Sequence, residues 1–424
     1  MVFIMIFSSL DLAPEIQQAV DECGYNEMTA IQQQAIIPAR RGKDILANAQ
    51  TGTGKTAAFA LPVLQQLHDQ PKPTLAGSPR ALILAPTREL AEQLTETIKR
   101  YAQFLPLSIT ALFGGVKISA QEKKLRAGTD IVIATPGRLL EHMEQGNIKL
   151  SSVKFVVLDE ADRMLDMGFI ADVQSILEKT PKKRQTLMFS ATISQAVKAL
   201  ANKLLHNHQL ISVARQNAIA DTVEHVAYPV GEHQKAELFV DLLEQHNWFK
   251  VLVFTSTKAQ ADELMAKLKP KKIKAALCHG DKSQGARRRA VADFKADKIQ
   301  VLVATEVAAR GLDIQGLEHV VNFNLPYLAE DYVHRIGRTG RAGSKGQAIS
   351  FVSREEERTL NNIERLIGEP IKRIKVPGYS VGSRETILNN LSERNRPAKS
   401  NKASQTKIEH NKVTRKKKSR KTSR

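Results

Sequence analysis

Residues 44–56 read DILANAQTGTGKT, and this stretch decides the fold that the sequence predicts. Asp44–Ala49 is a short apolar run, and a helical pattern follows the glycines from Ala57 to Leu67. An apolar strand, a glycine-containing loop, Lys-Thr and a helix, in that order, form the setting of a phosphate-binding loop. The alternative is a glycine-rich turn without a ligand, since Ala49 stands where the strict pattern requires glycine.

The predicted loop has the groups that a nucleotide phosphate needs. Its glycines let backbone N–H groups approach phosphate oxygens, and the following helix N-terminus adds positive potential. We predict that Lys55 reaches the β- and γ-phosphates and that the Thr56 hydroxyl binds Mg²⁺. The predicted phosphate cradle consists of Thr51, Gly52, Thr53, Gly54, Lys55 and Thr56.

Similar apolar runs recur in both halves of the chain, separated mostly by helical stretches of about 10–20 residues. They are rich in Val, Ile and Leu, which is typical of strands buried on both faces of a parallel sheet. The predicted strands of the first half are Asp44–Ala49, Ala81–Ala85, Asp130–Ala134, Val153–Leu158 and Thr186–Phe189. Those of the second half are Lys250–Phe254, Lys274–Cys278, Gln300–Ala304, His319–Phe323 and Gln347–Val352. We therefore predict two α/β domains, with ligands at the carboxyl ends of the strands.

Changes in composition predict the domain boundaries. We expect a first domain at residues 1–210, a linker at 211–222, a second domain at 223–379 and a basic, disordered tail at 380–424. Between Arg384 and Arg424, 14 Lys or Arg stand against 3 Glu, so this segment carries 11 of the 19 net positive charges. Such an excess indicates a polyanionic partner, and the alternative is a tail that only aids solubility.

Cysteine content and the apolar start narrow the class of protein. The two cysteines, Cys23 and Cys278, form no paired pattern. This excludes a disulfide framework and a cysteine-based zinc site, and it fits a reducing compartment. The apolar run Met1–Phe7 is too short for a signal peptide or a membrane span. We expect a soluble, cytoplasmic protein.

A pair of carboxylates follows the predicted strand Val153–Leu158, which ends in the sequence DEAD at residues 159–162. An apolar strand ending in Asp-Glu suits metal-assisted phosphoryl transfer. We predict that Asp159 holds Mg²⁺ through water and that Glu160 orients and deprotonates the attacking water. The alternative is an acidic loop at a helix start, where carboxylates interact favourably with the helix dipole.

The four residues 159–162 are the signature of the DEAD-box ATP-dependent RNA helicases, and the chain resembles that family from Phe7 to about Pro377. The other motifs of the family occur in order. The resemblance looks closest to the bacterial RhlE-type branch, through residues 279–287 and 376–379. It implies two tandem RecA-like domains, with ATP and Mg²⁺ as cofactors.

Residues 24–32, GYNEMTAIQ, resemble the family's Q motif, with Phe7 at the expected distance before them. The resemblance implies that Tyr25 stacks on adenine and that Gln32 contacts the exocyclic amine and N7. A carboxamide offers one donor and one acceptor, which match that edge of the base. The motif therefore implies ATP rather than GTP, although Met28 replaces the usual proline.

Residues 334–341, HRIGRTGR, resemble the family's arginine-finger motif in the second domain. A guanidinium stays charged and can donate two hydrogen bonds to phosphate oxygens, which suits transition-state charge. The resemblance implies that Arg338 and Arg341 are arginine fingers and that His334 couples the domains to the γ-phosphate. The alternative is a generic basic patch for phosphate or RNA.

Two further motifs receive their roles from the resemblance alone. In residues 304–313, ATEVAARGLD, Asp313 is expected to approach the ATP ribose, and Glu306 stands where Asp is usual. Ser190 and Thr192 belong to a motif that links hydrolysis to unwinding.

The resemblance also implies an RNA track across both domains. Contacts of this kind recognise backbone shape and the 2′-OH rather than base sequence, so we expect RNA rather than DNA. Each segment taken alone could equally be an ordinary turn. The basic tail around Lys416–Lys418 is expected to add non-specific phosphate affinity. The expected RNA contacts are Pro86, Thr87, Arg88, Gly115, Thr135, Pro136, Gly137, Arg138, Thr255, Gln284, Arg287 and Thr305.

Together these motifs predict an RNA helicase, an RNA-dependent ATPase that forms ADP and phosphate. We expect it to unwind short RNA duplexes locally or to remodel RNA–protein complexes, with no DNA or membrane partner. Ribosome assembly, mRNA turnover and cold adaptation are all compatible pathways. One alternative is an ATP-gated RNA clamp or annealing chaperone without net unwinding. A DNA-translocating helicase conflicts with the Q motif, and a phosphate-loop kinase or transport ATPase has no use for residues 334–341.

Overall fold

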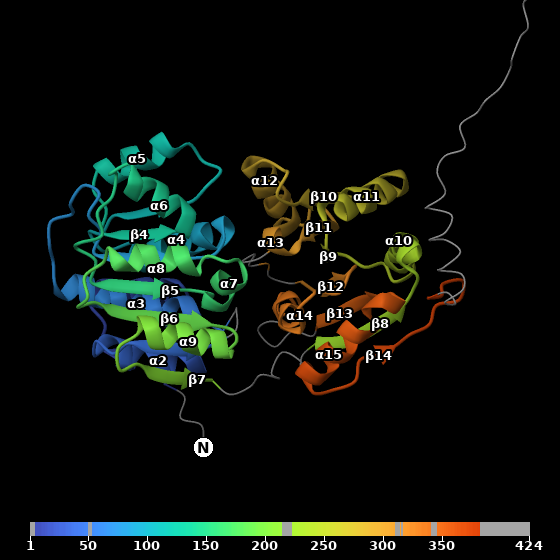
Figure 1. The fold of residues 1–424 in the computed structure, drawn as a ribbon, viewed down its shortest axis with the longest axis horizontal. Helices are drawn as coiled ribbons and strands as arrows, with labels where there is room; N and C mark the ends of the chain where they lie inside the picture. The colour runs from blue at the N-terminus through green and yellow to red at the C-terminus, as the bar shows by residue number, and fades with distance from the viewer. Residues whose placement is uncertain are drawn as a thin grey trace, which may run out of the picture. The chain divides into compact units, whose positions relative to one another are not determined.

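Each half of the chain forms a seven-stranded sheet whose described strand pairings are all parallel (Figure 1). The computed structural model describes residues 5–49, 53–213, 223–309, 314, 317–340 and 346–381. We call residues 5–213 the first lobe and residues 223–381 the second lobe. The predicted class, two α/β units with parallel sheets covered by helices, is confirmed.

In the first lobe, seven strands alternate with helices along the chain. The strands are β1 (Ile45–Asn48), β2 (Ala81–Leu84), β3 (Ile109–Leu112), β4 (Ile131–Ala134), β5 (Phe155–Leu158), β6 (Gln185–Ser190) and β7 (Gln209–Ser212). The helices are α1 (Pro14–Glu22), α2 (Ala30–Arg40), α3 (Lys55–Asp69), α4 (Arg88–Tyr101), α5 (Ile118–Arg126), α6 (Pro136–Glu144), α7 (Ala161–Asp166), α8 (Ile170–Glu178) and α9 (Gln195–Leu204), preceded by a 3₁₀ turn, η1 (Phe7–Leu10).

The second lobe repeats the alternation with fewer helices. Its strands are β8 (Val223–Pro229), β9 (Val251–Thr255), β10 (Ala275–Cys278), β11 (Val301–Thr305), β12 (His319–Asn322), β13 (Gly346–Val352) and β14 (Lys372–Arg373). Its helices are α10 (Lys235–Gln245), α11 (Lys258–Leu268), α12 (Gln284–Lys295), α13 (Glu306–Ala309), α14 (Ala329–Ile336) and α15 (Glu357–Ile367).

The two sheets share one topology. Their strand orders are β3-β4-β2-β5-β6-β1-β7 and β10-β11-β9-β12-β13-β8-β14. Subtracting seven from each strand number of the second order gives the first. The second half therefore repeats the fold of the first strand by strand, although the sequence shows no obvious repeat.

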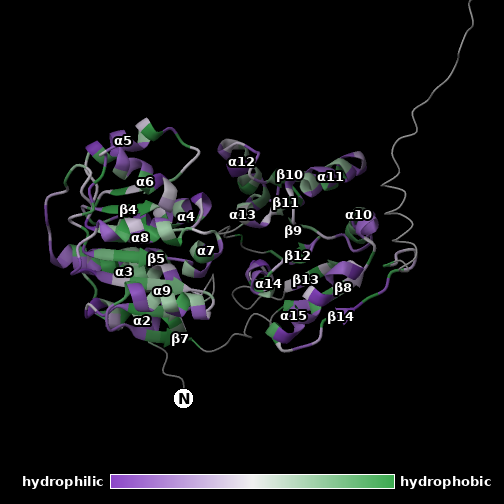
Figure 2. Ribbon diagram, in the orientation of Figure 1, coloured by the Kyte–Doolittle hydropathy of each residue, from purple (hydrophilic) through white to green (hydrophobic). Residues whose placement is uncertain are grey.

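Both faces of the first sheet are buried, because alternate residues of each strand enter two different cores. In β1, Ile45 and Ala47 face one core and Leu46 faces the other. Helices α1 to α4 supply the first core, whereas α5 to α9 supply the second. Burying each such aliphatic side chain stabilises the fold by about 1.5–3 kcal/mol. Figure 2 shows the hydrophobic strands of each sheet inside helices with mixed faces.

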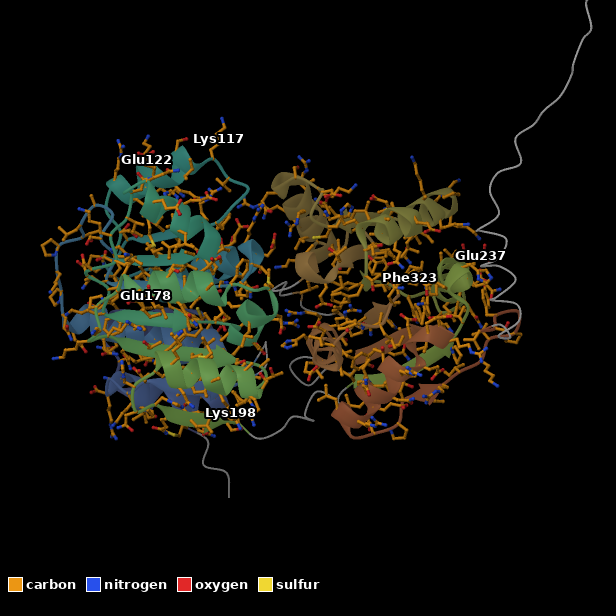
Figure 3. All side chains as sticks on the ribbon, in the orientation of Figure 1. Lys117, Glu122, Glu178, Lys198, Glu237 and Phe323 are labelled. Atoms are coloured by element: carbon orange, nitrogen blue, oxygen red, sulfur yellow. The ribbon has the colours of Figure 1, made fainter. Side chains whose placement is uncertain are left out.

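Most charged side chains of the described residues lie on the surface of the two lobes. Lys117 and Glu178 point away from the first lobe, while Phe323 lies within the second (Figure 3). Among the described residues, no helix combines the length and apolar character needed to cross a membrane.

The structure departs from the predicted elements at sheet edges and domain ends. Strands β3, β7, β8 and β14 were absent from the predicted set. Because β7 pairs with β1, Ile211 and Ser212 belong to the first sheet rather than to the predicted linker 211–222. Val213 packs against the first core, while residues 214–222 of that linker and residues 382–424 of the predicted tail lie outside the described residues.

Candidate nucleotide and RNA site

The predicted motifs fall into two groups along the carboxyl edge of the first sheet. The nucleotide motifs follow β1, β5 and β6, which are neighbours in the sheet. The first-lobe RNA motifs follow β2, β3 and β4, which are also neighbours. Since the carboxyl ends of parallel strands meet at one edge, the fold places both groups side by side on that edge.

Lys55 and Asp159 meet at the centre of the nucleotide group. Lys55 Nζ lies 3.5 Å from Asp159 Oδ1, and both side chains are buried. The ammonium makes no hydrogen bond to any described residue, so it has donors free for a ligand. Burial raises the pKa of Asp159, Lys55 lowers it in part, and Glu160 raises it further. A buried, incompletely neutralised charge pair of this kind fits a site for phosphate and a cation.

The backbone turns sharply at Glu160. This residue has φ +55°, a left-handed conformation that is uncommon for a residue with a side chain, and it directly precedes α7. Its N–H donates to Asp159 Oδ1 at 3.0 Å. The turn therefore sets two consecutive buried carboxylates at the end of β5.

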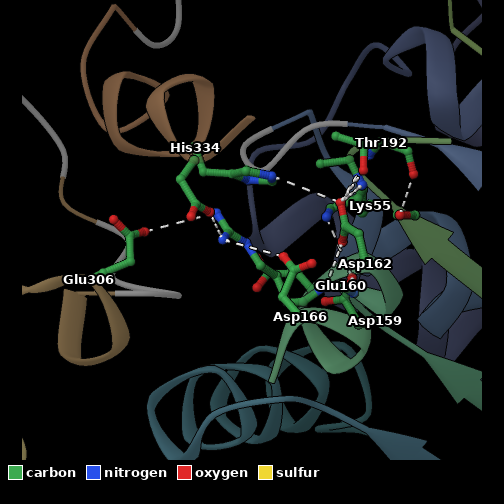
Figure 4. Close-up of polar contacts among 12 residues, drawn as sticks. Lys55, Asp159, Glu160, Asp162, Asp166, Thr192, Glu306 and His334 are labelled. Carbon is green, nitrogen blue, oxygen red and sulfur yellow. Dashed lines mark hydrogen bonds and ion pairs between the residues drawn. The ribbon is translucent and has the colours of Figure 1, made fainter. Parts of the chain in front are cut away.

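Asp162 connects the acidic motif to the residues after β6. Its Oδ2 accepts hydrogen bonds from Ala191 N–H at 3.1 Å, Thr192 N–H at 3.0 Å and the Thr192 hydroxyl at 3.1 Å. The Ser190 hydroxyl donates to the Thr192 carbonyl at 2.7 Å. Figure 4 shows these contacts beside Lys55 and Asp159. One carboxylate oxygen thus ties α7 to the segment that the sequence predicted to be a coupling motif.

The Q-motif glutamine contacts the phosphate-loop backbone directly. Thr29 N–H donates to Gln32 Oε1 at 2.8 Å, and Gln32 Nε2 donates to the Gly54 carbonyl at 3.1 Å. Gly54 has φ +88°, and a Cβ added there would collide with Gln32 Nε2. Gln32 therefore holds the loop, and both polar groups of its amide have protein partners in this arrangement.

The aromatic residues predicted for adenine occupy different environments. Phe7 is 1% exposed, whereas Tyr25 is 37% exposed. Their rings stack with centroids 5.9 Å apart, and the Tyr25 hydroxyl lies 3.2 Å from that of Tyr101. Tyr25 is therefore the ring with a surface available for a base, and Phe7 supports it from beneath.

The second lobe contributes polar contacts to α7. Asp162 Oδ2 lies 3.9 Å from His334 Nε2, and Arg163 forms an ion pair with Asp331, which also lies on α14 (Figure 4). Glu306 pairs with Arg335 and lies 3.9 Å from Arg163.

Arg338 is buried just beyond α14, near these contacts. The sequence assigned no role to these partners, although Arg163 and Asp331 lie close to quoted motifs and Arg335 lies within one.

The two arginines of the first-lobe RNA group contact the backbone of the loop after β3 instead of extending into solvent. The Arg88 guanidinium lies against Gly114 and Gly115, and a Cβ at Gly115 would collide with it. Arg138 Nη1 donates to the Val116 carbonyl at 2.9 Å. Of the other predicted contacts, Pro86 and Thr87 precede α4, and Thr135, Pro136 and Gly137 begin α6.

The second-lobe RNA residues follow the matching strands β9, β10 and β11. Thr255 and Thr305 end β9 and β11, while Gln284 and Arg287 lie on α12 after β10. Arg287 pairs with Glu89 at 2.6 Å, and Gln284 Nε2 donates to Glu89 Oε1 at 3.3 Å.

Four predicted site residues lie outside the described residues, namely Thr51, Gly52, Asp313 and Arg341. In the part of the chain that the structure describes, no three His, Cys, Asp or Glu side chains are grouped as a metal site would group them. A cation held by one carboxylate, one hydroxyl and substrate phosphates needs no such group.

Comparison with known proteins agrees with this geometry. Residues 29–200 match the DEAD/DEAH box helicase family, and residues 234–343 match the helicase conserved C-terminal domain. The ATP-dependent RNA helicase RhlB of Pseudomonas syringae is 41% identical over 370 residues, covering 86% of this chain and 93% of that protein. The DEAD-box ATP-dependent RNA helicase RhpA of Helicobacter pylori is 40% identical over 371 residues, covering 88% and 74%.

Two solved structures share the fold over most of the chain. S. cerevisiae Dbp5 bound to RNA and ADP BeF3 aligns with a TM-score of 0.78 and 31% identity, covering 92% of this chain and 99% of that one. Mss116p bound to ssRNA and AMP-PNP aligns with a TM-score of 0.78 and 29% identity, covering 92% and 82%. The chain belongs to the DEAD-box family of ATP-dependent RNA helicases. Its place in the RhlE-type branch stays a prediction.

Proposed function

We propose that this protein hydrolyses ATP in response to RNA and uses the cycle to separate short RNA duplexes or to remodel RNA–protein complexes. The observation that carries the proposal is the shared carboxyl edge of the first sheet. It places the buried Lys55–Asp159 pair and the RNA group on adjacent strands. Asp162 then joins the nucleotide half of that edge to residues 191–192.

In this scheme the first lobe binds the nucleotide. Lys55 bonds the β- and γ-phosphates with the donors that its burial leaves unsatisfied. Thr56, near the start of α3, and Asp159 would hold Mg²⁺, which supplies charge neutralisation on the phosphates when bound. Tyr25 stacks on the adenine, and Gln32 recognises its edge after exchanging one of its present partners.

Glu160 orients and deprotonates the attacking water, since it lies at the end of β5 beside Asp159. Arg338 and His334 approach from the second lobe, where Arg338 stabilises charge on the transferred phosphoryl group. The Asp162–Thr192 hydrogen bonds and the Asp162–His334 approach connect this chemistry to the second lobe.

ATP and RNA both bind more tightly to the closed state of the two lobes than to the open state. Each ligand therefore raises the affinity of the protein for the other. RNA lies along the residues after β2, β3 and β4 and their counterparts after β9, β10 and β11. These groups offer backbone N–H and short side chains, which fit phosphates and 2′-OH groups rather than base edges. We expect a cytoplasmic protein acting in ribosome assembly or mRNA turnover, with no DNA partner.

The coupling is tested by measuring RNA affinity with and without a non-hydrolysable ATP analogue. Tighter RNA binding with the analogue, and ATP-dependent separation of a short RNA duplex, are the expected results. An RNA affinity that is the same with and without the analogue would contradict the scheme. Strand separation of a DNA duplex of the same length provides the substrate control.

A clamp or annealing chaperone is the second candidate, and the net charge of +11 from Arg384 to Arg424 favours it. Cationic segments neutralise phosphate repulsion between two strands and so promote annealing. Parallel assays of strand annealing and strand separation distinguish the two functions. Annealing that proceeds without ATP, with no ATP-driven separation, would favour this candidate.

A further inference from the structure

A loop of the proposed RNA face is held from two sides by arginines. Residues 113–117 connect β3 to α5 and contain Gly114 and Gly115. Arg88, from α4, covers these glycines, and Arg138, from α6, donates to the Val116 carbonyl at 2.9 Å. Two helices, α4 after β2 and α6 after β4, thus contact the short loop after the neighbouring strand β3.

Gln121 is the buried group that joins this loop to Arg138. It lies on α5 and is only 4% exposed. Its Nε2 donates to the Phe113 carbonyl at 2.8 Å, and its Oε1 accepts from Arg138 Nη1 at 3.4 Å. The same Oε1 lies 3.0 Å from His142 Nε2 on α6. One amide therefore contacts the loop, the arginine and the next helix.

The network fixes the chemical state of His142. Because Gln121 Nε2 faces a carbonyl, Gln121 Oε1 must accept, so His142 Nε2 carries the proton. His142 Nδ1 then accepts from Asn147 Nδ2 at 3.2 Å. Burial lowers the pKa of His142, and Arg138 lowers it further, although Glu141 and Glu122 act in the opposite direction. The imidazole is therefore neutral, and each of its nitrogens has a partner.

We infer that Gln121 and His142 are positioning residues for RNA binding, which hold Arg138 and the loop 113–117 in the arrangement that receives the RNA backbone. Neither side chain can touch RNA itself, since both are buried. The inference rests on the proposed RNA-dependent function. It adds two residues beyond the motifs, neither of which the sequence singled out.

Gln121 preorganises the loop 113–117 for RNA binding. Without Gln121, the Phe113 carbonyl loses its buried donor, and Arg138 and His142 lose an acceptor. The loop then samples other conformations, and RNA must order it upon binding, which weakens affinity. Removing the whole amide should therefore weaken RNA binding by about tenfold. The nucleotide group lies after other strands and should not respond.

The test compares Gln121→Met and His142→Leu with Gln17→Met, a matched change at a partly exposed glutamine of α1. The readouts are the RNA concentration for half-maximal ATPase stimulation, the KM for ATP and the unstimulated rate. We expect the first to rise about tenfold in both Gln121→Met and His142→Leu, with the other two unchanged. The double variant should need little more RNA for half-maximal stimulation than either single variant, because both substitutions disrupt the same hydrogen-bond network.

Asn147→Ala removes the hydrogen bond to His142 Nδ1, together with an exposed one to Gln145 Oε1, and leaves Gln121 and His142 in place. It replaces the two buried variants if they fail to fold. It should raise the RNA requirement by about two- to fivefold without changing the KM for ATP. The inference is wrong if Gln121→Met and His142→Leu need no more RNA than Gln17→Met for half-maximal stimulation. It is also wrong if they raise the KM for ATP by the same factor as the RNA requirement. Wild-type ATPase that ignores RNA would instead refute the proposed function, so the two failures can be distinguished.

Discussion

Replacing Asp162 with asparagine preserves the size of the side chain but removes one of its two acceptor oxygens. Oδ2 accepts from Ala191 N–H, Thr192 N–H and the Thr192 hydroxyl, while Oδ1 accepts from Arg163 N–H at 3.0 Å. Asparagine can place its carbonyl oxygen at only one of these positions. Its NH₂ group must then face a donor at the other, and all four donors lose a charged acceptor.

The expected loss in the free energy of unfolding depends on how many hydrogen-bond donors lose their acceptor. Hydrogen bonds to a charged group contribute about 1.5–3 kcal/mol, against about 1 kcal/mol for neutral ones, and an orphaned buried donor costs about 1–3 kcal/mol. We therefore expect Asp162→Asn to lower the free energy of unfolding by about 2–4 kcal/mol. Thr192→Val removes one hydroxyl donor and leaves the carboxylate intact, so it should cost only about 0.5–1.5 kcal/mol.

Urea unfolding of wild type, Asp162→Asn and Thr192→Val measures these differences directly. An Asp162→Asn protein as stable as Thr192→Val would refute the hydrogen-bond reasoning. Because Asp162 also approaches His334, the rate of duplex separation should fall more than the ATPase rate. Equal losses in both rates would show that Asp162 does not couple them.

Three further results are expected. Gly54→Ala should raise the KM for ATP at least tenfold, about 1.4 kcal/mol, because its Cβ would collide with Gln32 at φ +88°; an unchanged KM would contradict this. Burial lowers the pKa of His225 to about 4 from 6.5, so only the unfolded chain gains this proton as pH falls. The free energy of unfolding should therefore drop by up to about 3 kcal/mol between pH 6.5 and pH 4, and His225→Gln should lack that part of the slope. Replacing Lys416–Lys418 with serine should reduce the dependence of log RNA affinity on log salt concentration by about 2, and an unchanged slope would exclude these lysines from RNA binding.

The sequence predicted the central strands other than β8, because their residues enter cores on both sides of the sheet. β2 and β5 are buried at every position, and their apolar runs were recognised within one residue at the carboxyl end. The edge strands β7 and β14 carry no such pattern. β7 exposes three of its four residues, and β14 exposes both. Pairing with a neighbouring strand, rather than hydrophobicity, defines these elements.

The motif residues could be named from the sequence, but their mutual contacts could not. Gln32 and Gly54 lie 22 positions apart, and only the fold shows that the glutamine donates to the glycine carbonyl. Asp162 was visible within the quoted motif, yet its bonds to Ala191 and Thr192 depend on α7 lying beside β6. Buried residues such as Gln121 have no sequence signal of this kind, because their role depends on partners that follow two neighbouring strands, β3 and β4.

Glu160 is proposed to activate water for an ATP hydrolysis that RNA controls. The most direct test is the ATPase rate of wild type and Glu160→Gln, with RNA, with DNA and with neither. Glu178→Gln, at an exposed position of α8, is the matched control. We expect RNA, but not DNA, to stimulate the ATPase rate strongly in wild type and Glu178→Gln. Glu160→Gln should have no ATPase activity. Hydrolysis that ignores RNA, or that survives in Glu160→Gln, would contradict the proposal.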